Sequence, residues 1–362
     1  MRTRVLNLFC GLLVLIALAP GGVGTAHSAS FRPIALPADA GSHADAHNEW
    51  WYFTGHLRDT AGHTYGFELT NFKFIGLRQL SSLMPFDRLF RIDLAITDEH
   101  AKQFYSAIGY VLPSPDKGYV SPQPLNSRMI APGASLAIHA LPGPGLAYQI
   151  QGAMANGSLD LHMRTTRPAL LEGKDGLEEI DHGYSYYYSL TNLETAGTLV
   201  VKGRQLQVTG TTWMDHQWGN WDWKYDKGWD WMAVQLNNGV SFSLVNFRSG
   251  RGKTFKFSAV SFPDGHQFFT TNASMSPLGK TWTSHQSATV YPIGWRIAVP
   301  ALGLIATVEP TVVGQEMVDP IRTGTTYWEG SGTLVGTVHG RPVTGLTYTE
   351  LAGYARRGGL PI

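Results

Sequence analysis

The stretch 214–219 holds residue types suited to acid–base chemistry, because Asp215 and His216 lie next to each other and Trp218 follows closely. An imidazole beside carboxylates titrates near neutral pH and can pass protons in both directions. If this stretch is a strand, alternation places His216 and Trp218 on one face and Asp215 on the other. We therefore expect His216 to be an acid or base beside an indole wall. The alternative is that Asp215 forms a hydrogen bond to a loop and that His216 only packs in the core.

A second carboxylate lies among tryptophans. Asp230 stands between Trp229 and Trp231, and five of the eleven tryptophans fall close together: Trp218, Trp221, Trp223, Trp229 and Trp231. Burial disfavours the charged form of a carboxyl, so a buried Asp230 would be a proton donor at neutral pH. The alternatives are that Asp230 is exposed on the opposite face, or that the tryptophans form a core seam between two sheets.

A third cluster lies near the start of the chain, where Glu49 precedes Trp50, Trp51 and Tyr52. We expect Glu49 to be another carboxylate facing the same cavity. The three aromatic residues are expected in the core or in a pocket wall, where flat apolar surfaces favour an unsaturated or aromatic ligand.

The tyrosine run 184–188 adds two candidate ligand-binding residues, Tyr186 and Tyr188. Strand alternation would send about half of these rings inward, where a phenol could orient a ligand. Packing within a strand explains the run equally well.

The elements that must position these residues are short antiparallel strands. Turn pairs recur between runs of alternating apolar residues: Asn156-Gly157, Lys202-Gly203, Asn238-Gly239, Asp264-Gly265 and His339-Gly340. Such pairs are typical of β-hairpins. Helical patterns are scarce, so the sequence predicts an all-β sandwich or barrel. We place a domain boundary near residues 210–226, where the Trp-rich segment would lie between two β-domains.

The N-terminus is expected to be a signal peptide. Arg2 and Arg4 precede an apolar run over 5–19, and small residues follow with cleavage choices after Ala26, Ser28 or Ala29. The apolar run is too short for a comfortable bilayer crossing, which needs about 20 residues. We therefore expect an exported chain, periplasmic or secreted, without a transmembrane anchor in its mature form. The only cysteine, Cys10, would be removed with the signal, which excludes disulfides and thiolate metal ligation.

Composition and motifs exclude several function classes. The formal charge is +1 and 15% of residues are charged, so the sequence lacks the excess of basic residues that indicates binding to nucleic acid or to an anionic membrane. The sequence has no His-Glu-x-x-His zinc motif, no Gly-x-Ser-x-Gly elbow and no phosphate-binding glycine loop. We therefore expect neither a metal nor a cofactor, and we disfavour a triad hydrolase.

Together these motifs resemble the lipocalin-like AttH/CrtC family over roughly residues 45–356. The matching segments are 47–52, 54–57, 186–189, 213–219, 228–231, 282–284, 291–295, 327–330 and 350–354. The resemblance implies two consecutive lipocalin-like antiparallel β-barrel domains, over 45–215 and 216–362, after a signal peptide (1–29) and a leader segment (30–44).

The family's best-defined members are carotenoid 1,2-hydratases (hydroxyneurosporene synthases), which add water to a terminal isoprenoid double bond without a redox cofactor. In these hydratases a His-x-Trp element is implicated in catalysis, and it matches His216 and Trp218. The AttH branch is exported, linked with ABC exporters and labelled as predicted secreted hydrolases. The signal peptide makes this chain more similar to that branch.

The sequence thus leads to two principal hypotheses. In the first, a cofactor-free enzyme hydrates an alkene of a hydrophobic, isoprenoid or carotenoid-like ligand. A protonated Asp230 or His216 would be the acid, tryptophan faces would stabilise the carbocation, and Asp215 or Glu49 would activate water. In the second, the chain only carries a hydrophobic ligand for an ABC exporter. A secreted esterase is a third reading that lacks an identifiable nucleophile.

Overall fold

The computed structural model describes residues 31–77, 86–180, 183–223, 226–249, 252, 254–320 and 326–355. The expected signal peptide and Cys10 lie outside the described residues. Met1–Pro33 and Ile34–Ile362 are two separate units, and everything below concerns the second unit.

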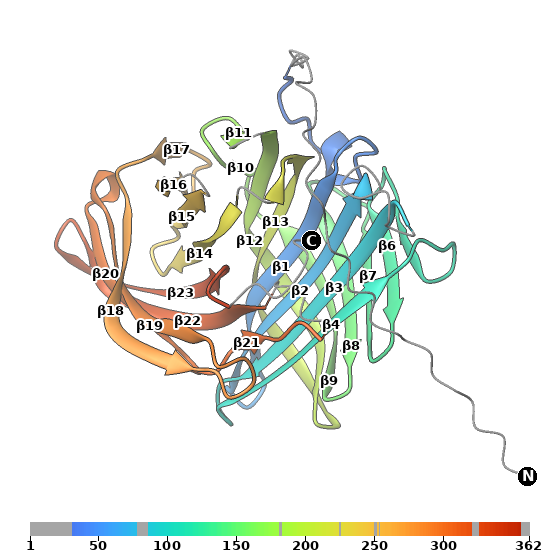
Figure 1. The fold of residues 1–362 in the computed structure, drawn as a ribbon. Helices are drawn as coiled ribbons and strands as arrows, with labels where there is room; N and C mark the ends of the chain where they lie inside the picture. The colour runs from blue at the N-terminus through green and yellow to red at the C-terminus, as the bar shows by residue number, and fades with distance from the viewer. Residues whose placement is uncertain are drawn as a thin grey trace, which may run out of the picture. The chain divides into compact units, whose positions relative to one another are not determined.

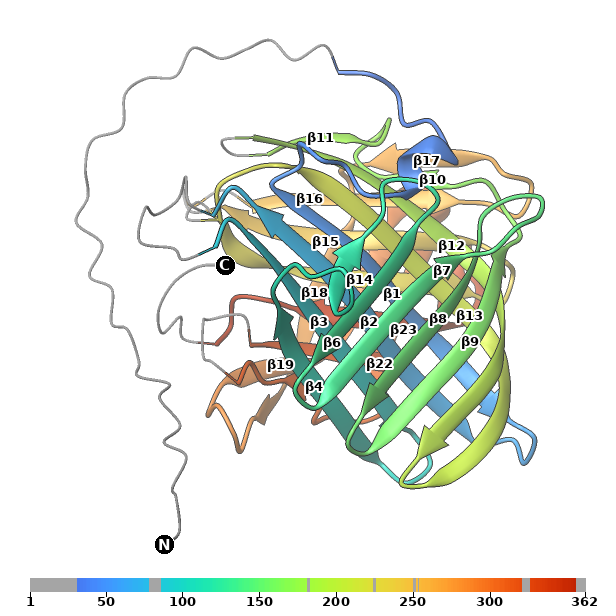
Figure 2. The same cartoon turned by 90° about the vertical axis from the view of Figure 1, so that its right-hand side faces the viewer.

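The first half of this unit forms one antiparallel sheet, which Figure 2 shows from outside. Its strands are β1 (Asn48–Asp59), β2 (Thr64–Ile75), β3 (Arg88–Asp98), β4 (Gln103–Val111), β5 (Gly118–Val120), β6 (Asn126–Ala131), β7 (Ala134–Ala140), β8 (Ala147–Met154), β9 (Gly157–Thr165), β10 (Leu170–Leu171), β11 (Leu177–Ile180), β12 (Gly183–Val201) and β13 (Arg204–Asn220). Their order is β4-β3-β2-β1-β13-β12-β9-β8-β7-β6-β5, and β10 and β11 pair with β12. Because β4 also contacts β6 and β7, the sheet curls into a near-closed barrel, called here the first barrel.

The second half forms another antiparallel sheet (Figure 1). Its strands are β14 (Asp226–Leu236), β15 (Ser241–Ser249), β16 (Thr254–Ser261), β17 (Gln267–Thr270), β18 (Ser274–Thr283), β19 (Val290–Val299), β20 (Leu304–Pro310), β21 (Glu316–Met317), β22 (Tyr327–Val338) and β23 (Arg341–Leu351). Their order is β17-β16-β15-β14-β23-β22-β20-β19-β18, with β21 on β22, and the sheet makes a half-barrel. Two short 3-10 helices, η1 (Ala38–Ala40) and η3 (Pro300–Leu302), complete the named elements. Within the described ranges, no helix is long and apolar enough to cross a bilayer.

The hairpin predictions are confirmed. Lys202 and Gly203 join β12 to β13 with φ of 48° and 79°, and His339 and Gly340 join β22 to β23 with φ of 49° and 76°. Two successive positive φ values match the twist of flanking strands in a two-residue hairpin. Asn238-Gly239 and Asp264-Gly265 also fall between consecutive strands, whereas the turn predicted at Asn156-Gly157 lies one residue earlier, because Gly157 already begins β9. The prediction of an all-β, lipocalin-like chain is therefore confirmed.

The chain passes from one sheet to the other inside the Trp-rich segment. β13 ends at Asn220 and β14 begins at Asp226, so the change of sheet lies between these two residues. The finer boundary after Asp215 falls inside β13, because that strand continues through His216 for four more residues.

Both faces of β1 and β13 are buried. Trp51 on β1 belongs to the core of the first barrel, together with Met214 on β13. On the opposite face, Tyr52 and Trp213 pack with Trp231 of the second sheet. Strand alternation therefore sends neighbouring residues of one strand into two different environments.

Buried hydrogen bonds also join the sheets. Tyr52 Oη donates to Glu329 Oε1 at 2.7 Å. Tyr327 Oη donates to Asp93 Oδ2 at 2.6 Å, and Asp93 is fully buried. Since a buried carboxylate that loses a donor keeps its desolvation cost, these bonds should matter to docking of the sheets.

We expect Tyr327→Phe to lower the free energy of unfolding by about 1–3 kcal/mol, because Asp93 would lose a charge-assisted donor while staying buried. Urea unfolding measures the change. Tyr119→Phe is the matched control at a half-exposed position and should leave the midpoint unchanged. Equal midpoints for the two variants would contradict the assigned role of the bond.

Candidate functional site

A cavity of about 640 Å³ lies between the two sheets. Its walls include side chains from β1, β2 and β14 and from the connection between the sheets: Trp50, Phe72, Trp221, Trp223, Trp229 and Trp231. Trp50 packs edge-on against Trp221, with ring centroids 5.4 Å apart and planes at 90°. An apolar, aromatic enclosure of this size can bury most of a small hydrophobic molecule.

Asp215 is a carboxyl group in the wall of this cavity and is 3% exposed. It accepts hydrogen bonds from Ser189 Oγ at 2.5 Å, Trp213 Nε1 at 2.6 Å and Tyr187 Oη at 2.7 Å. Burial raises the pKa of Asp215 to about 7, although these three donors favour the charged form. Such a group can give up or take up a proton near neutral pH.

Tyr187 fixes one side of this carboxyl. Its hydroxyl accepts a hydrogen bond from Trp231 Nε1 at 3.1 Å and donates its own proton to Asp215. Burial and the charge of Asp215 raise the pKa of Tyr187 well above its ordinary value, so the hydroxyl keeps this proton. Because Trp231 belongs to the second sheet, docking of the sheets completes the arrangement.

Four further acids line the cavity, and two of them, Glu178 on β11 and Glu350 on β23, have raised pKa values. Burial, followed by the charge of Asp215, raises the pKa of Glu178 to about 8. Burial also raises the pKa of Glu350 to about 8, against the effect of a hydrogen bond from Trp229. Both carboxyls are therefore neutral at pH 7 and can donate as well as accept a hydrogen bond.

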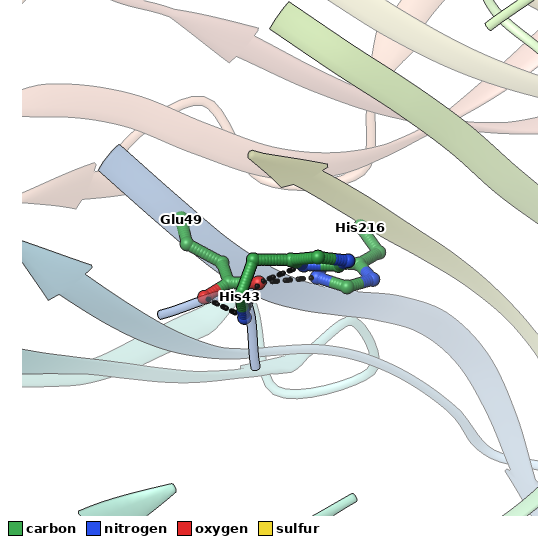
Figure 3. Close-up of side chains that lie close together, drawn as sticks. All are labelled: His43, Glu49 and His216. Carbon is green, nitrogen blue, oxygen red and sulfur yellow. Dashed lines mark hydrogen bonds and ion pairs between the residues drawn. The ribbon is translucent and has the colours of Figure 1, made fainter. Parts of the chain in front are cut away.

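His216 lies on the other face of β13, inside the first barrel, with Glu49 and His43 (Figure 3). His43 Nδ1 and His216 Nε2 lie 2.7 Å and 3.1 Å from Glu49 Oε1. Lys73 Nζ lies 2.5 Å from Glu49 Oε2, and both side chains of this ion pair are buried. These residues fasten the leader segment to the barrel, as does the bond from Trp51 Nε1 to Ala40 O at 3.0 Å.

In this cluster, burial and the neighbouring groups shift the pKa of Glu49 in opposite directions. Burial alone would raise the pKa of Glu49, but hydrogen bonds from His216 and His43 and the charge of Lys73 hold it well below the ordinary value. Burial lowers the pKa of His216 to about 4, so its ring is neutral at pH 7. Ligand atoms of His43, Glu49 and His216 lie within 4.8 Å of one another. However, Lys73 already neutralises the carboxylate and its charge opposes a metal ion there.

The structure does not bring the four expected catalytic residues together. Asp215 lines the cavity, whereas His216 and Glu49 lie inside the first barrel. The expectation that Glu49 faces the same cavity as Asp215 is corrected by alternation along β1, which points the neighbouring Trp50 there instead.

Asp230 is corrected as well. Arg248 Nη1 lies 2.6 Å from Asp230 Oδ1, and Tyr354 Oη donates to the same oxygen at 3.0 Å. Asp230 is outside the cavity lining, on the face of β14 opposite Trp229 and Trp231. It is therefore an ion-paired group and not a desolvated acid.

The expected ligand-binding residues divide in the same way. Trp50, Tyr52, Trp229 and Trp231 line the cavity. The others lie with His216: Trp51, Tyr186, Tyr188 and Trp218. Sequence reasoning missed Glu178 and Glu350 as site residues, although Glu350 belongs to the segment 350–354 that matched the family.

Comparisons with known proteins agree with this fold. The family model described as AttH-like matches residues 27–354. An AttH protein from Nitrosomonas europaea has a similar structure, with 25% identity and a TM-score of 0.78, and the match covers 92% of this chain and 100% of that one. No curated protein matches this chain.

Two more distant structures share the fold. Kievitone hydratase from Nectria haematococca is 16% identical with a TM-score of 0.68, and the match covers 89% of this chain and 94% of that one. CghA, solved with Sch210972, is 11% identical with a TM-score of 0.54, over 85% of this chain and 88% of that one.

We expect Glu49→Gln and Lys73→Met each to lower the free energy of unfolding by about 3–5 kcal/mol, because each leaves an unpaired buried charge. The double variant should lose much less than the sum of the two. Chemical denaturation of all four proteins gives the coupling energy.

The exposed pair Lys280 and Glu309 is the matched control, with Nζ and Oε1 2.9 Å apart. The corresponding Lys280→Met and Glu309→Gln cycle should give a coupling of about 0–1 kcal/mol. If the losses of unfolding free energy for Glu49→Gln and Lys73→Met were additive, the ion pair between Glu49 and Lys73 would not hold the leader segment in place.

Proposed function

This chain belongs to the AttH-like family, and we propose that it is a hydratase-like enzyme that adds water to an alkene of an apolar ligand in the cavity between the sheets. The observation that carries the proposal is the placement of Asp215. It is a carboxyl with a pKa raised to about 7, held by three donors in a tryptophan-walled cavity. Structural likeness to kievitone hydratase supports the fold on which the proposal rests.

In this mechanism the Asp215 carboxyl gives its proton to one alkene carbon, and the other carbon becomes a carbocation. A water molecule then forms a C–O bond to that carbon and returns a proton to the Asp215 carboxylate. The sum is alkene plus water giving an alcohol, with the enzyme unchanged. Since no electrons leave or enter, the reaction itself requires no redox cofactor.

The tryptophans stabilise the carbocation that forms when the alkene is protonated. The side chains of Trp50, Trp229 and Trp231 lie in the cavity wall with Asp215. A ring face attracts a nearby cation by about 0.5–2 kcal/mol, most strongly where water is excluded. The neutral carboxyls of Glu178 and Glu350 can orient the attacking water, because each offers both a donor and an acceptor.

His216 has a structural role in this proposal. Its ring is fully buried, stacks on Trp51 at 4.8 Å and lies in the first barrel with the ion pair of Glu49 and Lys73. The His-x-Trp element would then pack inside the first barrel and stabilise β13, the strand that carries Asp215. The reacting groups would lie on the opposite face of β13.

The ligand in this proposal is hydrophobic and unsaturated, of isoprenoid or carotenoid type. Its double bond must approach Asp215, and its remaining carbons must be accommodated by aromatic walls. The apolar run at residues 5–19 supports an exported enzyme.

A carrier is the second candidate, favoured by the same aromatic cavity, which binds a ligand whether or not chemistry follows. In that case the chain would hold a hydrophobic molecule for an ABC exporter. The two functions differ in Asp215, because a carrier has no need of a carboxyl whose pKa lies near neutrality.

The first experiment is incubation of the mature protein with an organic extract of its source cells, followed by mass spectrometry of bound and free fractions. Depletion of one species, with a product heavier by one water, would support the hydratase. A ligand recovered unchanged would favour the carrier.

We expect Asp215→Asn to lower turnover by about 10²–10⁴-fold while ligand binding is retained, because the amide cannot donate the proton. Product formation and binding are measured separately by mass spectrometry and by quenching of tryptophan fluorescence. Asp230→Asn is the matched control and should keep turnover, since its ion pair lies outside the cavity lining. Full activity of Asp215→Asn would refute the proposed acid.

A further inference from the structure

Glu172 is a fully buried glutamate that no step above uses. It lies in the turn after β10, between strands of the two sheets. Ser243 Oγ on β15 donates to Glu172 Oε2 at 2.7 Å. On the other side, Ser189 Oγ on β12 lies 2.9 Å from Glu172 Oε1 and 2.5 Å from Asp215 Oδ1.

The hydroxyl of Ser189 has one proton and two carboxyl neighbours. A hydroxyl can donate one hydrogen bond, so Ser189 cannot donate to Glu172 and to Asp215 at once. The second contact is a hydrogen bond only if one of the two carboxyls is protonated and donates to Ser189 Oγ. The arrangement therefore holds one shared proton.

The remaining partners show where this proton rests. Trp213 Nε1 can only donate, and it is directed at Asp215. Tyr187 Oη accepts a hydrogen bond from Trp231 Nε1, so its own proton is free to be donated to Asp215 Oδ2. With Ser189 as third donor, Asp215 is surrounded as a carboxylate, which leaves the shared proton on Glu172.

We propose that Glu172, Ser189 and Asp215 form a proton relay, in which Glu172 is the positioning residue that stores the proton and Asp215 is the group that delivers it to the ligand. This inference rests on the proposed function. Burial and the charge of Asp215 raise the pKa of Glu172 well above its ordinary value, in agreement with a stored proton.

The relay is balanced over one reaction cycle. The proton on Glu172 Oε1 moves to Ser189 Oγ as the Ser189 proton moves to Asp215 Oδ1. Asp215 then protonates the alkene, and the attacking water later returns one proton to Asp215. The reverse transfer through Ser189 restores the proton on Glu172.

The titratable groups that face the pair come from three strands: Glu178 on β11, Tyr187 on β12 and Glu350 on β23. Burial raises the pKa of Glu178 and of Glu350 to about 8 and that of Tyr187 well above its ordinary value. These groups are therefore uncharged near pH 7, where the shared proton is the one that moves.

The decisive variant is Glu172→Gln, whose amide N–H still donates to Ser189 but stores no proton. We expect turnover at pH about 6 to stay within about twofold of the parent, because Asp215 itself is then protonated. At pH about 8 we expect a loss of about tenfold, since the pKa of Asp215 is about 7. KM should be unchanged, because Glu172 lies outside the cavity lining.

Glu316→Gln is the matched control, because Glu316 on β21 is also buried and accepts hydrogen bonds from Ser287, between β18 and β19, and from Tyr291 on β19. It should leave the pH profile unshifted. A Glu172→Gln profile parallel to that of the parent at every pH would overturn the relay and leave the hydratase standing.

A second measurement needs no ligand. Carboxyl carbon-13 NMR of the labelled protein follows the titration of Glu172 directly. We expect Glu172 to be protonated at pH 7 in the parent, and to titrate at lower pH in Asp215→Asn, because a neighbouring negative charge is removed.

An ionised Glu172 at pH 7, or a titration that Asp215→Asn leaves in place, would overturn the relay whatever the ligand proves to be. If the coupled titration is found but no ligand is hydrated, the proton-sharing pair stands and the proposed function fails.

Discussion

The wall formed by β1, β12 and β13 is shared by two sheets, so neither of its faces meets water freely. In most antiparallel sheets one face is solvated and polar residues can be placed there at little cost. Here each carboxyl on either face must be paired with a cation, be surrounded by hydrogen-bond donors, or keep its proton. Glu49 is paired with Lys73 inside the barrel, whereas Asp215 on the cavity side is surrounded by neutral donors. This difference in partners gives the two carboxyls opposite acid strengths.

Much of the fold could be predicted from sequence because its signals are local. Lys202-Gly203 and His339-Gly340 need only their neighbours to specify a turn, and the alternation of Asp215 and His216 follows from strand geometry alone. The environment that each face of β13 meets, barrel interior or cavity, could not be predicted in the same way. Which side of β13 becomes barrel interior depends on pairing with β1 and β12, at residues distant in sequence.

The site was predicted in part for a related reason. Trp50, Trp229 and Trp231 could be recognised because tryptophan clusters are uncommon in sequence. Glu178 and Glu350 are ordinary residues whose pKa changes only after burial, and nothing in their local sequence indicates that burial. Asp230 shows the converse error. Its tryptophan neighbours suggested an isolated carboxylate, but Arg248 forms an ion pair with it and Tyr354 donates a hydrogen bond to it from other segments.

The hairpin of β12 and β13 carries Tyr187, Ser189 and Asp215 on adjoining strands joined by a two-residue turn. These groups can come together early, since contacts close in sequence form at low entropic cost. Their acidity cannot be set so early, because Trp231 and Ser243 arrive from the second sheet. A hairpin without that sheet would hold Asp215 as an ordinary exposed aspartate. The acid strength of this one carboxyl is therefore a product of assembly, and it reports whether the two halves of the chain have docked.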